Sequence, residues 1–251
     1  EIGHTLGLRH NFKASSIYSI DQLSDPAFTQ KYGISGSVMD YQPINVFDGT
    51  TFFQTKPGTY DYWAIEYAYK QPDRSTHSED IFLEEIASRS TDPLLQYGTD
   101  EDTFGLSTRG IDPQSNAWDL TDDPMAYYQK RFELANELWE SIPEHFEKDG
   151  AQYSKLRGVF GRGMRQYRNA SRNIAKYIGG MYHSRHHVGD PGGDNPFKIV
   201  PAEKQRDALN FILNRILAAD AFNFDPDLLN KLAPGRDWDF KGTVWRMSRI
   251  D

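Results

Sequence analysis

Three residues near the start of the sequence could together carry out metal-dependent hydrolysis: Glu1, His4 and His10. They stand in the run Glu-Ile-Gly-His-Thr-Leu-Gly-Leu-Arg-His. One more histidine directly before Glu1 would complete the pattern H-E-x-x-H-x-x-G-x-x-H. Histidines four residues apart lie on one face of a helix, so both imidazoles can reach one zinc ion. We therefore expect the chain to begin one residue inside a zinc-binding motif.

The other letters of the run fit the same chemistry. Glu1 would lie beside the metal and take a proton from the attacking water, which makes it the candidate general base. Gly7 ends the helix and lets the chain turn, which brings His10 to the ion that His4 binds. Three neutral imidazoles leave a fourth position open, as catalytic Zn2+ requires. A chance match to the four fixed letters that the chain contains, Glu1, His4, Gly7 and His10, is expected roughly once in 10⁵ start positions.

A second run, Ser37-Val38-Met39-Asp40-Tyr41, lies in a turn bounded by a glycine and a proline. Alone, Met39 could be a core methionine and Tyr41 a packed aromatic residue. Together with the first run, the pattern S-x-M-x-Y resembles the metzincin metallopeptidases, which have a methionine-containing turn beneath the zinc site. The resemblance implies that Met39 forms an apolar floor under the histidines. It also implies that Tyr41 is a switchable ligand or a phenol donor to the tetrahedral intermediate.

More narrowly, the sequence resembles the bacterial Met-zincin family of large zinc peptidases. The run Pro-Gly-Thr-Tyr-Asp-Tyr-Trp-Ala-Ile at residues 57–65 supports this resemblance together with the two runs above. Asn11 departs from other metzincins, because astacin-like enzymes have Glu and reprolysin-like enzymes have Asp after the third histidine. The resemblance implies Zn2+ as cofactor and a protein or peptide as substrate. It implies a secreted, periplasmic or cell-envelope location in a bacterium.

Composition limits the other possibilities. The 251 residues carry a net charge of -8, which disfavours nucleic acid or an anionic membrane as a partner. There is no cysteine, so a metal site must rest on histidine and carboxylate. No apolar run approaches the ~20 residues that a membrane-spanning helix needs.

Apolar spacing predicts a mainly α fold. A first helix is expected to end near residue 6, and a second to begin after Pro57-Gly58. A third, short helix is expected within residues 77–89. A long irregular stretch covers residues 92–122. Three further helices are expected: one beginning at Pro124, one carrying apolar residues from 153 to 178, and one beginning at Pro201 with a buried stripe of Leu209, Ile212, Leu213, Ile216 and Leu217. Residues 179–196 must form a loop or hairpin.

The resemblance implies that the first part of the chain is the C-terminal subdomain of a metzincin-type zincin, and the long helices after it suggest an appended antiparallel helical bundle. We expect residues 1–119 to hold the zinc site and the methionine turn, and residues 120–251 to form a helical region of the same catalytic unit. Phe132, Trp139, Phe160 and Tyr167 should be largely buried.

Two other clusters have weaker cases. His183, His186 and His187 could form a second metal site, but no carboxylate or helix was expected to fix their geometry, so a structural or solvated loop is favoured. The acidic residues around 100–102 could hold calcium, but their spacing fits no known loop, which favours a solvated stretch.

The sequence therefore predicts a zinc metalloendopeptidase whose upstream half completes the site. Without the first histidine, this chain alone is expected to hold zinc weakly and to be inactive. Two alternatives stay open: a non-catalytic peptide- or glycan-binding module on a zincin scaffold, and a zinc hydrolase that acts on peptidoglycan peptides.

Overall fold

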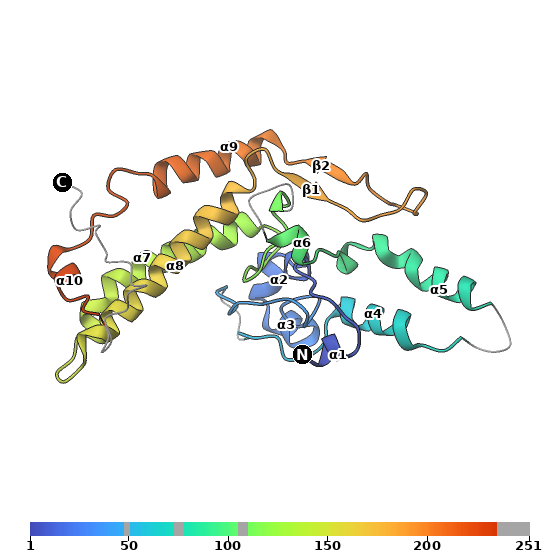
Figure 1. The fold of residues 1–251 in the computed structure, drawn as a ribbon, viewed down its shortest axis with the longest axis horizontal. Helices are drawn as coiled ribbons and strands as arrows, with labels where there is room; N and C mark the ends of the chain where they lie inside the picture. The colour runs from blue at the N-terminus through green and yellow to red at the C-terminus, as the bar shows by residue number, and fades with distance from the viewer. Residues whose placement is uncertain (48–50, 73–77, 105–109, 235–251) are drawn as a thin grey trace. The chain divides into compact units, whose positions relative to one another are not determined.

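The computed structural model describes residues 1–47, 51–72, 78–104 and 110–234, and it is mainly helical (Figure 1). The chain forms two compact units. The first contains residues 1–127 and 176–206, and the second contains residues 128–175 and the chain from residue 207 onward. Among the described residues, no helix is long and apolar enough to span a membrane.

Short helices joined by ordered loops make up most of the first unit. Its α-helices are α1 (Ile2–Thr5), α2 (Ile20–Ser24), α3 (Pro26–Tyr32), α4 (Thr59–Tyr69), α5 (Glu79–Ala87) and α6 (Asp100–Thr103). Its 3-10 helices are η1 (Ala14–Ile17), η2 (Ser88–Thr91) and η3 (Pro93–Leu95). The helices α7 (Pro124–Phe146) and α9 (Ala202–Phe211) begin in this unit and continue into the second.

Helix boundaries in the first unit follow the capping residues. The hydroxyl of Ser19 accepts a hydrogen bond from the amide of Gln22, and the side-chain oxygen of Gln22 accepts one from the amide of Ser19, so α2 begins with a complete capping box. Asp25 caps α3, which has Pro26 at its first position. The helix expected within residues 77–89 is confirmed as α5, although residue 77 lies outside the described residues.

The segment expected to be a loop or hairpin is a hairpin. Its strands β1 (Met181–His183) and β2 (Phe197–Ile199) are antiparallel, with Met181 opposite Ile199. The irregular stretch from residue 92 to 122 contains only η3 and α6 as regular elements among its described residues.

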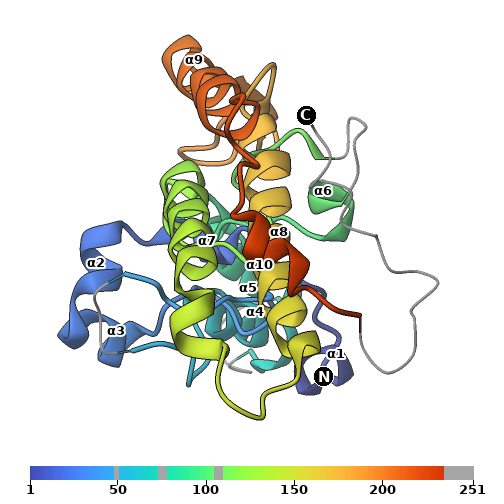
Figure 2. The ribbon, with the colours of Figure 1, turned by 90° about the vertical axis from the view of Figure 1, so that its left-hand side faces the viewer.

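An antiparallel helix pair forms the second unit. It comprises most of α7 together with α8 (Tyr153–Ala175), the π-helix η5 (Ile212–Ile216) and α10 (Pro226–Asn230). Figures 1 and 2 both show α7 and α8 side by side. The pairing is antiparallel because contacts early in α7 reach late positions of α8. Phe132 contacts Tyr167, whereas Trp139 contacts Phe160. These four side chains are at most 5% exposed, which confirms the predicted burial.

The predicted buried stripe after Pro201 is only partly correct. Leu209, Leu213 and Leu217 are 42%, 51% and 67% exposed, while Ala208 and Ile216 are buried. The buried face is therefore centred on the small Ala208 rather than on the leucines. The π-helical turn then adds one residue per turn, so the apolar positions after it leave the 3.6-residue spacing on which the prediction rested. Tyr153 and Ile178, also expected on a buried helical face, are 53% and 42% exposed. Tyr153 is the first residue of α8, and Ile178 lies beyond its end.

The contact between α7 and α8 predicts a sharp difference between two glycines of α8. A Cβ atom at Gly163 would lie 2.2 Å from Nε1 of the buried Trp139, whereas a Cβ atom at the exposed Gly158 would meet nothing within 4 Å. We expect Gly163→Ala to lower the free energy of unfolding by roughly 1–3 kcal/mol through overpacking. Gly158→Ala should raise it by roughly 0.5–1 kcal/mol, because alanine loses less backbone entropy in a helix. Urea denaturation followed by circular dichroism measures both, and equal effects would contradict this packing.

Candidate metal centre

The helix that carries the first candidate ligand is one turn long and ends as the sequence predicted. Gly7 has φ +86°, a left-handed conformation that glycine adopts without strain. The amide of Gly7 donates to the carbonyl of His4 at 3.0 Å, and the amide of Leu8 donates to the carbonyl of Gly3 at 3.0 Å. This C-terminal turn reverses the chain and carries it back towards His4.

The turn brings the two candidate ligands together. The ring centroids of His4 and His10 are 4.8 Å apart, with the rings nearly perpendicular. Nδ1 of His4 lies 2.9 Å from the carbonyl oxygen of Leu8. Since a carbonyl can only accept, Nδ1 carries the proton and Nε2 of His4 keeps a free lone pair.

A carboxylate orients the second imidazole in the same way. Nδ1 of His10 lies 3.1 Å from Oδ1 and 3.2 Å from Oδ2 of Asp100, so the ring donates from Nδ1 and keeps its Nε2 lone pair. Although burial opposes ionisation of Asp100, the hydrogen bond from His10 lowers the pKa of this carboxyl overall. A carboxylate behind a metal-binding histidine is a common second partner in zinc sites, because it fixes the tautomer and the ring orientation.

Met39 and Tyr41 flank the imidazoles. Met39 is 5% exposed and packs under α1, where a Cβ atom at Gly3 would lie 2.2 Å from its Sδ. The ring of Tyr41 lies 4.6 Å from that of His10. The structure therefore places four of the five predicted site residues close together.

Glu1 is placed differently. It precedes α1 as an exposed residue, and its carbonyl accepts a hydrogen bond from the amide of Thr5 at 3.2 Å. In the part of the chain that the structure describes, no protein group holds its carboxylate. Its side chain is near the start of the helix that carries His4, but its contacts do not fix it against the imidazoles.

The turn at residues 37–41, here the Met-turn, is held by a carboxylate that sequence analysis quoted without assigning a role. Asp61 lies in the first turn of α4 and is 4% exposed. Its Oδ1 accepts from the hydroxyl of Ser37 at 2.5 Å, and its Oδ2 accepts from the amides of Val38 at 2.8 Å and Gly58 at 2.7 Å. The hydroxyl oxygen of Ser37 then accepts from the amide of Met39 at 2.9 Å. The position of Asp61, three residues after the helix N-cap, is the sequence signal for this role.

Asn11, the residue after the second candidate ligand, has a side chain that both donates and accepts. It is fully buried, and its Nδ2 donates to the carbonyl of Gln96 at 2.9 Å. Its Oδ1 accepts from the amides of Lys13 and Gly98, each at 3.2 Å. Its own amide donates to the carbonyl of Met39 at 3.1 Å. An ionised carboxylate could not donate to Gln96, so the amide suits this position.

Two buried carboxyl groups lie next to the Met-turn. Oδ2 of Asp40 accepts from the amide of Ser15 at 3.0 Å, and Oδ1 of Asp119 accepts from the hydroxyl of the same Ser15 at 2.9 Å. Burial raises the pKa of Asp119 to about 7. Burial, and then the charge of Asp119, raises the pKa of Asp40 well above its usual range. One of these groups can therefore stay protonated under conditions in which surface carboxyls are ionised.

The acidic stretch at residues 100–102 is paired with basic residues, which was not predicted, although Glu101 is exposed as expected. Glu101 accepts two hydrogen bonds from the guanidinium of Arg9, at 2.7 and 2.6 Å. Asp102 accepts two from Arg185, at 2.9 and 2.8 Å, and its Oδ1 lies 3.3 Å from Nδ1 of His183. Because Asp100 holds His10, the short helix α6 joins the candidate metal centre to the β1–β2 hairpin. The interaction pairs residues about 80–90 positions apart in the sequence, so spacing could not reveal it.

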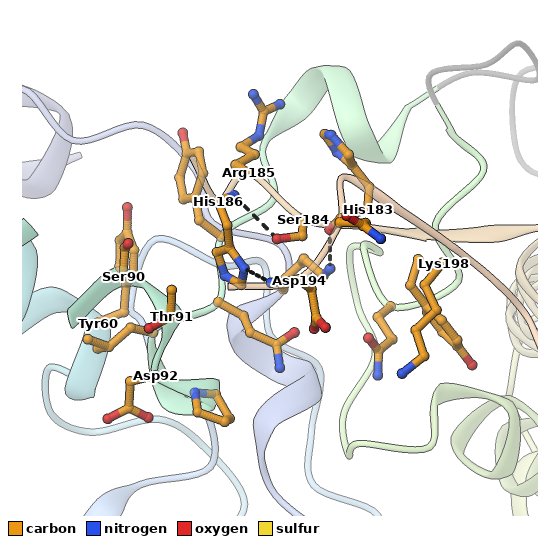
Figure 3. A pocket seen from close by; sticks show the side chains of 18 of the residues that line it. Tyr60, Ser90, Thr91, Asp92, His183, Ser184, Arg185, His186, Asp194 and Lys198 are labelled. Atoms are coloured by element: carbon orange, nitrogen blue, oxygen red, sulfur yellow. Dashed lines mark hydrogen bonds between the residues drawn. The ribbon is translucent and has the colours of Figure 1, made fainter. Parts of the chain in front are cut away.

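A pocket of about 550 Å³ lies between this hairpin and the chain around η2 and η3 (Figure 3). Its labelled lining residues are Tyr60, Ser90, Thr91, Asp92, His183, Ser184, Arg185, His186, Asp194 and Lys198. Nδ1 of His186 accepts a hydrogen bond from the amide of Asp194 at 2.8 Å, so it carries no proton. The expectation that no carboxylate fixes the histidine cluster was wrong for His183, which Asp102 contacts. His187 is exposed.

The chemistry of the two imidazoles fits a zinc ion. Each Nδ1 has an oxygen acceptor, and no hydrogen bond from the described part of the chain engages either Nε2, so both Nε2 atoms are available to a metal. Among the described residues, no group of three or more histidines, cysteines or carboxylates could hold a metal ion. The described chain thus supplies two ligands, one fewer than a catalytic zinc site takes from protein.

The support of the Met-turn predicts that Asp61→Asn destabilises the first unit. The asparagine side chain would keep one acceptor oxygen, but its NH2 group would replace the other. That NH2 group would then face N–H or O–H donors that the carboxylate now accepts. We expect the free energy of unfolding to fall by roughly 1–3 kcal/mol, the cost of buried unsatisfied donors. Asp80→Asn is the control, because Asp80 is exposed in the first turn of α5 and should change stability by less than ~0.5 kcal/mol. Urea denaturation that ranks the two variants equally would contradict the anchoring role.

The family comparison agrees with this geometry. A family model described as Met-zincin matches residues 1–249, which is nearly the whole sequence. Comparison with the curated proteins and with the solved structures found no match. The family match confirms the resemblance inferred from the motifs and indicates a zincin-type metallopeptidase fold. The chain belongs to the Met-zincin family.

Proposed function

We propose that the chain is the C-terminal part of a zinc-dependent metalloendopeptidase. The observation that carries the proposal is the pair of imidazoles, with ring centroids 4.8 Å apart, whose Nδ1 atoms both have oxygen acceptors and whose Nε2 atoms have no hydrogen-bond partner among the described residues. His4 and His10 would hold Zn2+, with a third imidazole directly before Glu1 as the motif requires. Met39, packed under α1, would form the apolar floor of this site.

The chain's own residues then have distinct roles. When bound, Zn2+ polarises the scissile carbonyl and lowers the pKa of water. Glu1 accepts a proton from the attacking water and delivers it to the leaving amine. The phenol of Tyr41 donates a hydrogen bond to the oxyanion of the tetrahedral intermediate, since its ring lies 4.6 Å from that of His10. Asp100 keeps His10 in the tautomer that binds metal.

The remaining parts of the proposal concern the whole polypeptide. The first unit would correspond to the C-terminal subdomain of a metzincin, and the α7–α8 pair to an appended bundle. An upstream half would supply the first histidine and the facing wall of the cleft. It would also hold the carboxylate of Glu1, which is exposed here. The substrate would be a protein or peptide outside the bacterial cytoplasm.

Exchange of the general base tests the enzymatic role. In the full polypeptide, we expect Glu1→Gln to lower hydrolysis of casein by ~10²–10⁴-fold, because the amide cannot accept the proton. Zinc content, measured by atomic absorption, should not change, because Glu1 is not a ligand. Glu144→Gln, which alters an exposed glutamate of α7, is the control and should keep full activity. A Glu1→Gln protein with undiminished activity would exclude this mechanism, and a wild-type protein that binds peptides without cleaving them would favour a binding module.

The carboxylate behind His10 gives a second prediction. In the full polypeptide, Asp100→Ala should weaken zinc binding by ~10–100-fold, because it removes the acceptor that orients the imidazole. Asp100→Asn should lie between wild type and Ala, since an amide oxygen can still accept from Nδ1. Glu101→Gln is the matched control on the same helix turn, because Glu101 pairs with Arg9 and not with a histidine. Competition with a zinc-chelating dye measures the affinities, and an unchanged affinity in Asp100→Ala would remove Asp100 from the site.

A further inference from the structure

Trp118 combines a strained backbone with an exposed side chain. Its φ is +65°, a left-handed conformation that is rare for a bulky residue. Its side chain is 53% exposed, so burial of the indole does not offset the strain. A costly conformation of this kind persists only where the surrounding structure imposes it, and such residues concentrate at functional sites.

The neighbours of Trp118 impose the conformation. Ala117 is 8% exposed, and both Asp119 and Leu120 are fully buried. Asp119 is held by the hydroxyl of Ser15 at 2.9 Å and by the side-chain amide of Asn116 at 2.9 Å. With buried residues on both sides, the left-handed turn projects only Trp118 into solvent.

The indole projects beside the candidate metal centre. The amide of Trp118 donates to the carbonyl of Tyr41 at 2.8 Å, and its ring stacks on that of Tyr41 at 5.7 Å and 23°. Tyr41 in turn contacts His10. The strained residue is therefore separated from a candidate ligand by a single aromatic ring.

Trp118 belongs to a larger aromatic surface. The fully buried Phe12 contacts Tyr41 at 5.4 Å and Phe104 at 5.3 Å. Tyr41 and Phe104 are 43% and 41% exposed. We call the exposed rings of Trp118, Tyr41 and Phe104 the aromatic strip. Phe12 also contacts His10 at 5.0 Å, so the strip and the imidazole share one support.

We propose that the aromatic strip binds a bulky apolar side chain of the substrate, next to the bond that is cleaved. The inference rests on the proposed peptidase function, because it takes the occupant to be a peptide held at His4 and His10. Continuity with His10 favours a substrate over a separate partner, since Tyr41 contacts both His10 and Trp118. Exposed aromatic faces favour large apolar groups, and contact with them excludes water from both surfaces. Trp118 would thus set specificity rather than take part in bond cleavage.

The test uses the full polypeptide and two substitutions that suit a left-handed residue. Trp118→Asn and Trp118→Gly both remove the indole, and both residues adopt φ +65° with less strain than tryptophan. We expect kcat/KM to fall ~10–100-fold for peptides with Phe or Leu beside the scissile bond, and by less than ~3-fold for peptides with Gly there. The melting temperature should be equal to that of wild type or higher, because strain is removed. Tyr153→Ala is the control, since Tyr153 is also 53% exposed but lies at the start of α8 in the second unit.

A second arm separates this inference from the peptidase function. Isothermal titration with the same Phe and Gly peptides into the Glu1→Gln protein measures binding without turnover. Preference for Phe that is lost in the Glu1→Gln, Trp118→Asn double variant supports the strip even if wild type cleaves nothing. The proposal would be overturned if the protein with Trp118 showed no preference between Phe and Gly peptides, or if the Trp118 substitutions lowered kcat/KM or affinity equally for both peptides. It would also be overturned if the substitutions lowered the melting temperature and left the preference unchanged, which would show that Trp118 only packs on Tyr41.

Discussion

The geometry of the candidate centre depends on the hydrogen bonds that the carboxylate of Asp61 accepts. It is buried in the first turn of α4, and it accepts from the turn that contains Met39 and from the segment that leads into α4. A buried carboxylate is costly unless it is fully hydrogen-bonded, so these donors and the acceptor require one another. The close approach of the two segments adds a steric condition, because a Cβ atom at Gly58 would lie 2.1 Å from the carbonyl oxygen of Gly36. The Met-turn and the Pro-Gly-Thr-Tyr-Asp run are therefore one structural unit, although they are separated in the sequence.

Further hydrogen bonds and ion pairs connect this unit to His10 and to the hairpin. Asn11 ties the segment after His10 to the Met-turn and to residues 96–98. The chain then enters α6, whose consecutive acidic residues hold His10, Arg9 and the hairpin residue Arg185. Three adjacent carboxylates thus fix groups from two distant parts of the chain. Asp100 and Asp102 belong to the same short helix, so one helical turn holds both His10 and the hairpin residue Arg185.

How much the sequence could predict depended on the range of the interaction. Features that depend on residues close in sequence were predictable: Gly7 ends α1 and Pro124 begins α7. Most apolar positions spaced three and four residues apart in α7 and α8 are buried, as predicted. The closeness of His4 and His10 follows from a turn of known geometry. The partners of Asp100 and Asp102 were not predictable, because acidic residues in a loop look the same whether they are solvated or paired across the fold. Periodicity also failed after Phe211, where a π-helical turn changed the number of residues per turn.

The distribution of burial around the imidazoles divides the site into a rigid floor and an open side. Below and behind them, Met39, Phe12, Asn11 and Asp61 are all at most 5% exposed and are hydrogen-bonded or packed. Beside them, Tyr41 and Trp118 are about half exposed, and Glu1 is held by none of the described residues. A peptide must reach the imidazoles from a side that is not filled, whereas the imidazoles must keep one orientation for a metal to bind. Strain at Trp118 is consistent with this division, because the buried floor fixes the backbone of a residue whose side chain stacks on Tyr41 but stays about half exposed. The exposed part of the indole is left free for a ligand.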